Sequence, residues 1–188
     1  MCRTRSGVGI VGPLQSIHRL RFLNADRGGG VVSEFLEFST AKVDSLPEGL
    51  EAVVLTSDLQ GVVSSWRDGG ANVLVGVQVA DEFTELADAR KPPALENTGI
   101  VLAGDLYSAP AGDKRGATGD VREAFSELNR WVVGVPGNHD LAGPSREREG
   151  LEGLDNISIL DSTIGVRDGL KIGGVGYVIF ETKRVTSV

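Results

Sequence analysis

Short apolar runs alternate with amphipathic segments from residue 51 onward, and this alternation predicts the secondary structure. Buried parallel strands are predicted for three continuous apolar runs rich in β-branched residues, at residues 52–56, 99–103 and 131–135. Two helices are predicted from apolar side chains that recur on one face, at residues 80–90, after the apolar run 73–79, and at residues 120–130. Strands that alternate with helices in this way indicate an α/β fold, in which right-handed crossovers connect the strands of a parallel sheet.

The pattern is less regular at both ends of the chain. Residues 17–23 and 31–38 are predicted strands on either side of a glycine-rich turn, so we expect an N-terminal hairpin or an addition to a sheet edge. Four more short strands are predicted at residues 157–160, 163–166, 170–175 and 177–180. A tight turn is predicted at Asp168-Gly169, between two of these strands. The change of pattern divides the chain into residues 1–50, an N-terminal extension or hairpin of unassigned role, and residues 51–188, the α/β domain.

The composition is that of a globular protein large enough to bury a core. The chain has 188 residues, of which 40% are hydrophobic and 24% charged, and this excludes a disordered chain or a fibre. No apolar run approaches the roughly 18–20 residues of a membrane helix, and the short apolar stretch near the N-terminus is too broken by glycine for a signal peptide. The single cysteine excludes an internal disulfide and a cysteine-rich zinc site. We therefore expect a cytoplasmic protein with no membrane partner.

The charge balance narrows the classes of partner. The chain carries 19 Lys and Arg residues against 26 Asp and Glu residues, a net charge of −7. A protein that coats a phosphate backbone needs a basic face, so nucleic acid is an unlikely partner. A nuclease is kept as a third hypothesis, because a local basic groove could escape a net count. An acidic balance does suit a site that binds cations first and phosphate groups through them.

Each of the three predicted parallel strands runs into a loop that carries a potential metal ligand. Asp58 follows the first strand, Asp105 the second, and Asn138, His139 and Asp140 follow the third. Because ligands bind beyond the carboxyl ends of strands in such sheets, we expect these side chains to converge there. Two carboxylates, an amide oxygen and an imidazole suit a hard or borderline cation. Either aspartate alone would more commonly cap a helix or complete a turn, and only the ordered set favours a shared site.

In order, the motifs Asp-x-Gln, Gly-Asp and Gly-Asn-His-Asp resemble those of the calcineurin-like metallophosphoesterases, from residue 51 to residue 180. The resemblance implies a four-layer α/β/β/α sandwich with two divalent metal ions, Mn, Fe or Zn. It implies that Asp58 binds the first metal, that Asp105 bridges both, and that Asn138 binds the second. His139 would steady the phosphoryl oxygens and protonate the leaving group, and Asp140 would orient or tune it.

The implied activity is metal-dependent hydrolysis of a phosphomonoester or phosphodiester. In this mechanism a metal-bound hydroxide attacks phosphorus while His139, as an imidazolium, assists departure of the alkoxide. The substrate would be a phosphorylated small molecule or a phosphodiester. The sequence leaves the oligomeric state open.

The sequence departs from the family pattern at two places. Gln60 stands where the family places a metal-binding histidine, and its harder, weaker carbonyl ligand favours Mn or Mg over Zn. Alternatively, Gln60 simply caps a helix. No histidine follows His139, although the family adds further histidines in its second half, and His18 is predicted to be structural. The first hypothesis is that the chain is truncated, and the second is a short variant that binds metal poorly. The alternative function is accordingly a truncated or catalytically impaired metallophosphoesterase-like binding module.

Overall fold

The computed structural model describes residues 8–26, 28, 30–64, 71–89, 94–108, 115–141 and 155–176. The predicted strand at residues 177–180 lies outside this part of the chain. The first strands are β1 (Gln15–Ala25), β2 (Val31–Thr40), β3 (Ala52–Thr56), β4 (Val62–Ser64), β5 (Asn72–Leu74) and β6 (Thr98–Leu102). The later ones are β7 (Gly116–Ala117), β8 (Trp131–Gly134), β9 (Asp140–Leu141), β10 (Ile157–Ile159), β11 (Thr163–Arg167) and β12 (Leu170–Gly174). Two α-helices, α1 (Val75–Asp88) and α2 (Gly119–Leu128), and a short 3-10 helix, η1 (Leu95–Asn97), complete the described elements.

The central sheet has the strand order β10-β8-β6-β3, and all its strands are parallel. The predicted α/β class is therefore confirmed, and so are its three parallel strands. One detail of the prediction is wrong: a continuous apolar run predicts burial on both faces, yet Leu55 is 74% exposed. The cause is position, since β3 is the edge strand of this sheet.

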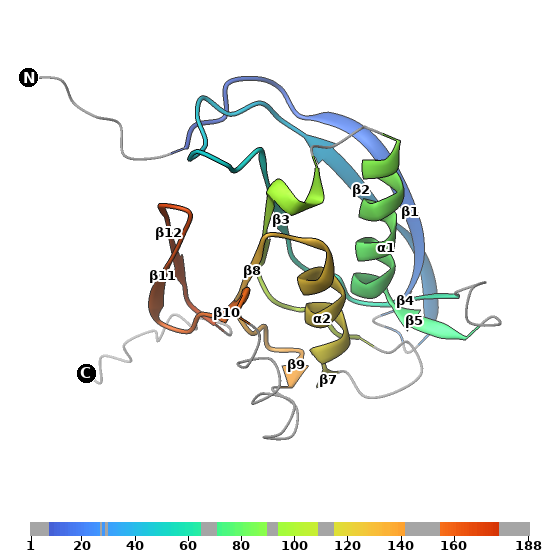
Figure 1. The fold of residues 1–188 in the computed structure, drawn as a ribbon. Coiled ribbons are helices and arrows are strands. Elements are labelled where there is room, and N and C mark those ends of the chain that lie inside the picture. Colours follow the sequence, from blue (N-terminus) through green and yellow to red (C-terminus); the bar gives the residue numbers. More distant parts are fainter. Residues whose placement is uncertain are drawn as a thin grey trace, which may run out of the picture.

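Both α-helices lie on one face of the central sheet, and the N-terminal sheet covers their other side (Figure 1). That second sheet has the order β2-β1-β4-β5. The first helix begins at Val75, five residues before its predicted start, because the apolar run at residues 73–79 is shared between β5 and the first turn of α1. Such a short run does not distinguish strand from helix by its periodicity. Within it, Gly76 packs directly against Val121 of α2.

The predicted N-terminal hairpin is present, with β1 and β2 paired antiparallel. Its inward side chains, among them Phe22 and Phe38, join one hydrophobic cluster with Phe125 of α2 and Ile100 of β6. His18 has the structural setting that the sequence predicts. Its Nε2 lies 2.9 Å from Glu82 Oε2 of α1, and its ring contacts Phe38 edge-on.

The hairpin β11–β12 lies on the opposite face of the central sheet from the helices (Figure 1). Its turn is the predicted one, with positive φ angles of 47° at Asp168 and 82° at Gly169. Trp131 is buried together with Val133 and Leu160 beneath the hairpin. The longest α-helix in the described ranges has 14 residues, and none of the described helices is long and apolar enough to cross a membrane.

Candidate functional site

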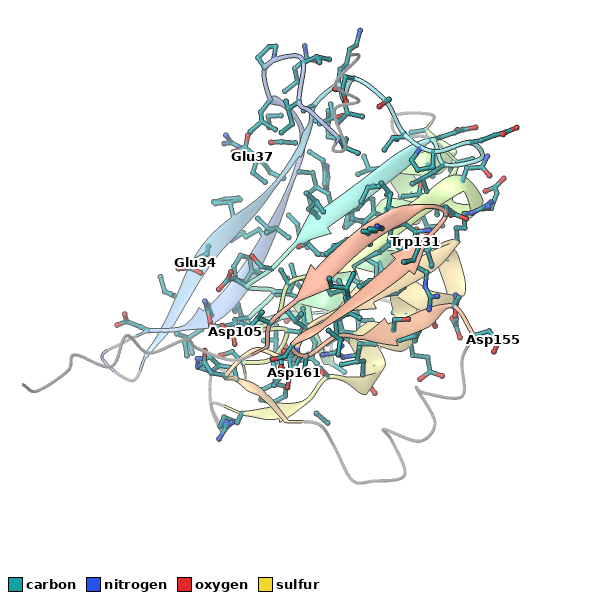
Figure 2. The ribbon with its side chains drawn as sticks, turned by 90° about the vertical axis from the view of Figure 1, so that its left-hand side faces the viewer. Glu34, Glu37, Asp105, Trp131, Asp155 and Asp161 are labelled. Carbon is teal, nitrogen blue, oxygen red and sulfur yellow. The ribbon has the colours of Figure 1, made fainter. Side chains whose placement is uncertain are left out.

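The loops that follow β3, β6 and β8 meet at one edge of the central sheet, as the sequence predicts. Backbone hydrogen bonds join the first two loops, from Asp58 N to Gly104 O at 3.1 Å and from Ala103 N to Thr56 O at 2.8 Å. In Figure 1 this edge faces the bottom of the picture, where β9 begins at Asp140. Figure 2 shows Asp105 and Trp131 toward opposite ends of the sheet.

Asp58 and Asp105 occupy equivalent positions after their strands and share an unusual backbone conformation. Their φ angles are 54° and 55°, in the left-handed region that side chains other than glycine rarely adopt. Such conformations persist where the surrounding structure enforces them, and they cluster at functional sites. Neither aspartate is the N-cap of a described helix, since Leu74 precedes α1 and Thr118 precedes α2. The helix-cap interpretation of these residues is therefore wrong, and both are loop residues at the shared edge.

The second and third loops approach each other closely. The Oδ1 atom of Asp105 accepts a hydrogen bond from His139 N at 3.0 Å. Gly137 packs so tightly against the backbone and carboxylate of Asp105 that no Cβ atom fits there. Gly104 has a φ angle of 88°, which glycine adopts at little cost. These two glycines therefore let the loops touch, and they set Asp105 beside the Asn138-His139 segment.

The carboxylate of Asp140 forms a second connection between the same two loops. Asp140 is only 3% exposed, and its Oδ1 accepts a hydrogen bond from Leu106 N at 2.7 Å. Its Oδ2 accepts another from Gly137 N at 2.8 Å. Asp105 and Asp140 thus each accept an amide hydrogen bond from the loop that carries the other. In the structure, Asp140 connects the loops after β6 and β8 through these two hydrogen bonds. Its predicted influence on His139 stays a prediction.

Arg122 is a residue of this region that sequence analysis missed. It lies on α2, is 4% exposed, and donates from Nε to Thr118 Oγ1 at 3.3 Å. Burial lowers the pKa of its guanidinium, and the negative charge of Asp140 partly offsets this by raising it. No sequence signal separates Arg122 from an ordinary solvated helix arginine, because its burial depends on contacts between distant segments.

Gln60 and Asn138, the two predicted amide ligands, are both half-buried in the loops at this edge. Gln60 lies between the fully buried Leu59 and the left-handed Gly61. The alternative that Gln60 caps a helix is wrong, because α1 begins much later and no side chain hydrogen-bonds at its N-cap, Leu74.

Asp161 is a further acidic residue at this edge. It follows β10, the fourth strand of the parallel sheet, and its Oδ1 accepts a hydrogen bond from Gly176 N at 3.3 Å. Gly176 in turn packs against Pro136 in the loop after β8. The rule that located Asp58 and Asp105 would also have located Asp161, because the strand at residues 157–160 was itself predicted.

The donor atoms at this edge suit a hard divalent cation. Carboxylates of Asp58 and Asp105, with amide oxygens of Gln60 and Asn138, are the ligand types that Mn²⁺ and Mg²⁺ accept. The left-handed conformations of both aspartates are a second feature in keeping with a binding site. Within the described residues, no three His, Cys, Asp or Glu side chains come together as a metal-binding group.

Comparison of this chain with protein-family models, curated proteins and solved structures finds no match.

Proposed function

We propose that this protein is a metal-dependent phosphoesterase of the calcineurin-like type, which hydrolyses a phosphomonoester or phosphodiester. One observation carries the proposal: the loops bearing Asp58, Asp105 and Asn138-His139 meet at the carboxyl edge of a parallel sheet and are joined by hydrogen bonds. The order of these residues along the chain and the strand that each follows are those of the family motifs.

The arrangement of layers supports the same proposal. The two α-helices, the central sheet and the β11–β12 hairpin would correspond to the first three layers of an α/β/β/α sandwich. The N-terminal sheet, which covers the helices, would be an addition to that architecture. In this proposal the candidate site lies at the end of the sandwich where the loops after β3, β6 and β8 meet.

The proposed chemistry assigns one task to each side chain. Asp58, Asp105, Gln60 and Asn138 would hold two divalent cations, with Asp105 shared between them and Mn²⁺ favoured by the hard oxygen donors. When bound, such cations neutralise phosphate charge and make a water acidic enough to attack near neutral pH. His139 would donate a proton to the leaving alkoxide oxygen. Its backbone amide donates a hydrogen bond to the Asp105 carboxylate, so the backbone of His139 lies beside the proposed cation site.

The test is hydrolysis of an aryl phosphate monoester and of a bis-aryl phosphate diester with added Mn²⁺. Asp105→Asn should lower kcat/KM by more than about a hundredfold, because loss of groups that only support a metal ligand already costs 10–100-fold. Asp155→Asn is the matched control, since Asp155 is exposed and precedes β10 at the other end of the sheet (Figure 2). Equal rates for the two variants, or a wild-type rate no higher than background, would contradict the proposal.

The second candidate is a catalytically impaired module that binds a ligand or partner. Gln60, which stands where the family places a metal-binding histidine, favours this candidate. Metal analysis after dialysis separates the two candidates. About two retained ions per chain together with turnover support the phosphoesterase. Binding of phosphate or metal without turnover supports the module.

A further inference from the structure

The strand β2 forms one border of the N-terminal sheet over a length of 10 residues. Within the described residues it pairs with β1 only, so a row of its backbone N–H and C=O groups faces away from the sheet. Such a row is a template for another strand, and proteins commonly guard it with lysine or proline. β2 contains neither residue. Figure 2 shows Glu34 and Glu37 along this border, away from Asp105 and Trp131.

The alternation of hydrogen bonds identifies the residues whose amides face the free edge. At the end of the hairpin, Asp26 N donates to Gly30 O at 2.8 Å. Hydrogen-bonded pairs alternate with non-hydrogen-bonded pairs along an antiparallel ladder, so the even-numbered residues of β2 bond to β1. The odd-numbered residues therefore direct their amides outward, and these are Val31, Ser33, Phe35 and Glu37.

The side chains of the same residues lie on the outer face of the sheet, where apolar and charged groups are close together. Phe35 is 67% exposed. Arg21 of β1, which lies opposite Phe35, donates from Nε to Ser33 Oγ at 2.7 Å. Arg19 Nη2 lies 3.5 Å from Glu37 Oε2. The free edge thus carries an exposed aromatic ring with both signs of charge beside it.

A second copy of β2 fits this edge when the two strands run antiparallel about Phe35. In that register Phe35 lies opposite Phe35 and Ser33 lies opposite Glu37, and all of these residues direct their amides to the edge. A shift of the pairing in one direction would place Glu34 opposite Glu34, and a shift in the other would place Phe35 opposite Glu37. Aromatic pairs across strands stabilise a sheet and like charges destabilise it. The register centred on Phe35 is therefore favoured.

The charges of two copies are complementary in this register. Glu37 of one copy comes opposite Ser33 of the other, whose hydroxyl already accepts the guanidinium of Arg21. The carboxylate of Glu37 therefore lies beside an arginine of the second copy as well as Arg19 of its own chain. Two-fold symmetry forms this contact twice. A strand of another protein would need the same spacing of glutamate and arginine to match it, so the edge fits a copy of itself.

We propose that β2 is the interface of a homodimer, in which two copies of the strand pair antiparallel about Phe35. The two four-stranded N-terminal sheets then form one continuous sheet. The helices separate the N-terminal sheet from the central sheet, so the candidate sites of both copies lie away from this interface (Figure 1). The inference goes beyond the proposed function and does not depend on it.

The first test is sedimentation velocity of the full chain. A small edge interface binds weakly, so the wild type should pass from monomer to dimer between about 1 and about 300 μM. Phe35→Lys should raise the dimer Kd by at least about thirtyfold, the usual effect of losing an aromatic residue at the centre of an interface. At the low end of the concentration range the chain is a monomer, and unfolding there reports on the fold alone.

Ile164→Lys is the matched control, because Ile164 is 73% exposed on the β11–β12 hairpin. This variant should keep the dimer Kd within about twofold of wild type, since distant sites act independently. A wild type that stays monomeric throughout the range would overturn the proposal. So would a dimer that Ile164→Lys weakens as much as Phe35→Lys does.

A charge exchange tests the contact between Glu37 and Arg21. Arg21→Glu should weaken the dimer by about tenfold, because it replaces attraction by repulsion at two symmetric contacts. Arg21→Glu combined with Glu37→Arg restores opposite charges and should recover most of that loss. A double variant that dimerises no better than Arg21→Glu would overturn the proposed register.

Crosslinking tests the register without weakening the interface by charge. In a Cys2→Ser background, Phe35→Cys places two sulfur atoms opposite each other across the strands, at a Cα separation of about 5.5 Å that permits a disulfide. Mild oxidation should therefore give a covalent dimer. Ser33→Cys in the same background is the control, because its two copies lie four residues apart along the strands, about 13 Å. Equal crosslinking of the two variants, or more with Ser33→Cys, would overturn the proposal.

Discussion

Asp168 shows how one residue fastens an outer element to the central sheet. Its carboxylate accepts hydrogen bonds from Arg130 Nε at 2.6 Å and from Trp131 Nε1 at 2.8 Å. The hydrogen bond from Arg130 has the largest effect and lowers the pKa of Asp168 below its ordinary value of 3.8. Partial burial opposes this shift, and the hydrogen bond from Trp131 lowers the pKa by a smaller amount. A lowered pKa means that the folded state favours the ionised carboxylate. The bond between β8 and the β11–β12 turn is therefore sensitive to acid.

Asp168→Asn should destabilise the protein in a pH-dependent way. The stabilisation by ionised Asp168 is complete above the ordinary pKa and is lost as pH falls through the lowered folded pKa. The gap in unfolding free energy between wild type and variant should thus be larger at about pH 6 than at about pH 2.5. Urea titrations at both pH values measure it, with Asp155→Asn as the exposed control. A gap that does not narrow in acid would refute this account.

At the scale of elements, β2 shows how the N-terminal sheet is attached. Side chains alternate along this strand, so Phe38 is 7% exposed while Phe35 is 67% exposed. Phe38 packs between His18 of β1 and Phe83 of α1, with ring centroids 5.2 and 5.3 Å away. The strand therefore packs against the first helix through one face only.

The two phenylalanines form a matched pair for a stability experiment. Phe38→Ala should lower the free energy of unfolding by about 3–5 kcal/mol, the usual cost of removing a buried aromatic ring. Phe35→Ala should change it by less than about 0.5 kcal/mol, as exposed substitutions do. Urea denaturation of both variants gives the comparison. Similar losses in the two variants would contradict the packing of β2 on α1.

At the scale of the whole molecule, one hydrophobic cluster crosses the predicted boundary at residue 50. Leu20 and Phe38 from the N-terminal hairpin share it with Val79, Phe125 and Val132 from the helices and the central sheet. Elements that share a core gain stability from one another, so neither part is expected to unfold alone.

The full chain should consequently unfold in a single cooperative transition. Far-ultraviolet circular dichroism follows the secondary structure of the backbone. Fluorescence follows the tryptophans, including Trp131, which is buried beneath the β11–β12 hairpin. Their urea transitions should coincide, because a shared core couples the N-terminal sheet to the rest. Two separated midpoints would show instead that residues 1–50 form an independent unit.

Predictability differs between the fold and the site. The bounds of β3 and the hairpin turn at Asp168-Gly169 follow from local patterns, whereas the start of α1 was misplaced because its first turn is as apolar as a strand. The meeting of Asp58 and Asp105 at one edge was predictable from strand order. The bond between Asp140 and Leu106 was not, because these residues are 34 positions apart and no periodicity relates them.

The α/β class, the strands and the residues at their carboxyl ends can be predicted from the amino-acid sequence. These depend on apolar periodicity and turn chemistry, which act over a few neighbouring residues. The packing of the N-terminal sheet on the helices, the exposure of Leu55 and the burial of Arg122 become known only from the folded structure. Burial of a side chain depends on which distant segments pack around it, so the residue type, polar or apolar, does not by itself specify the environment of the side chain.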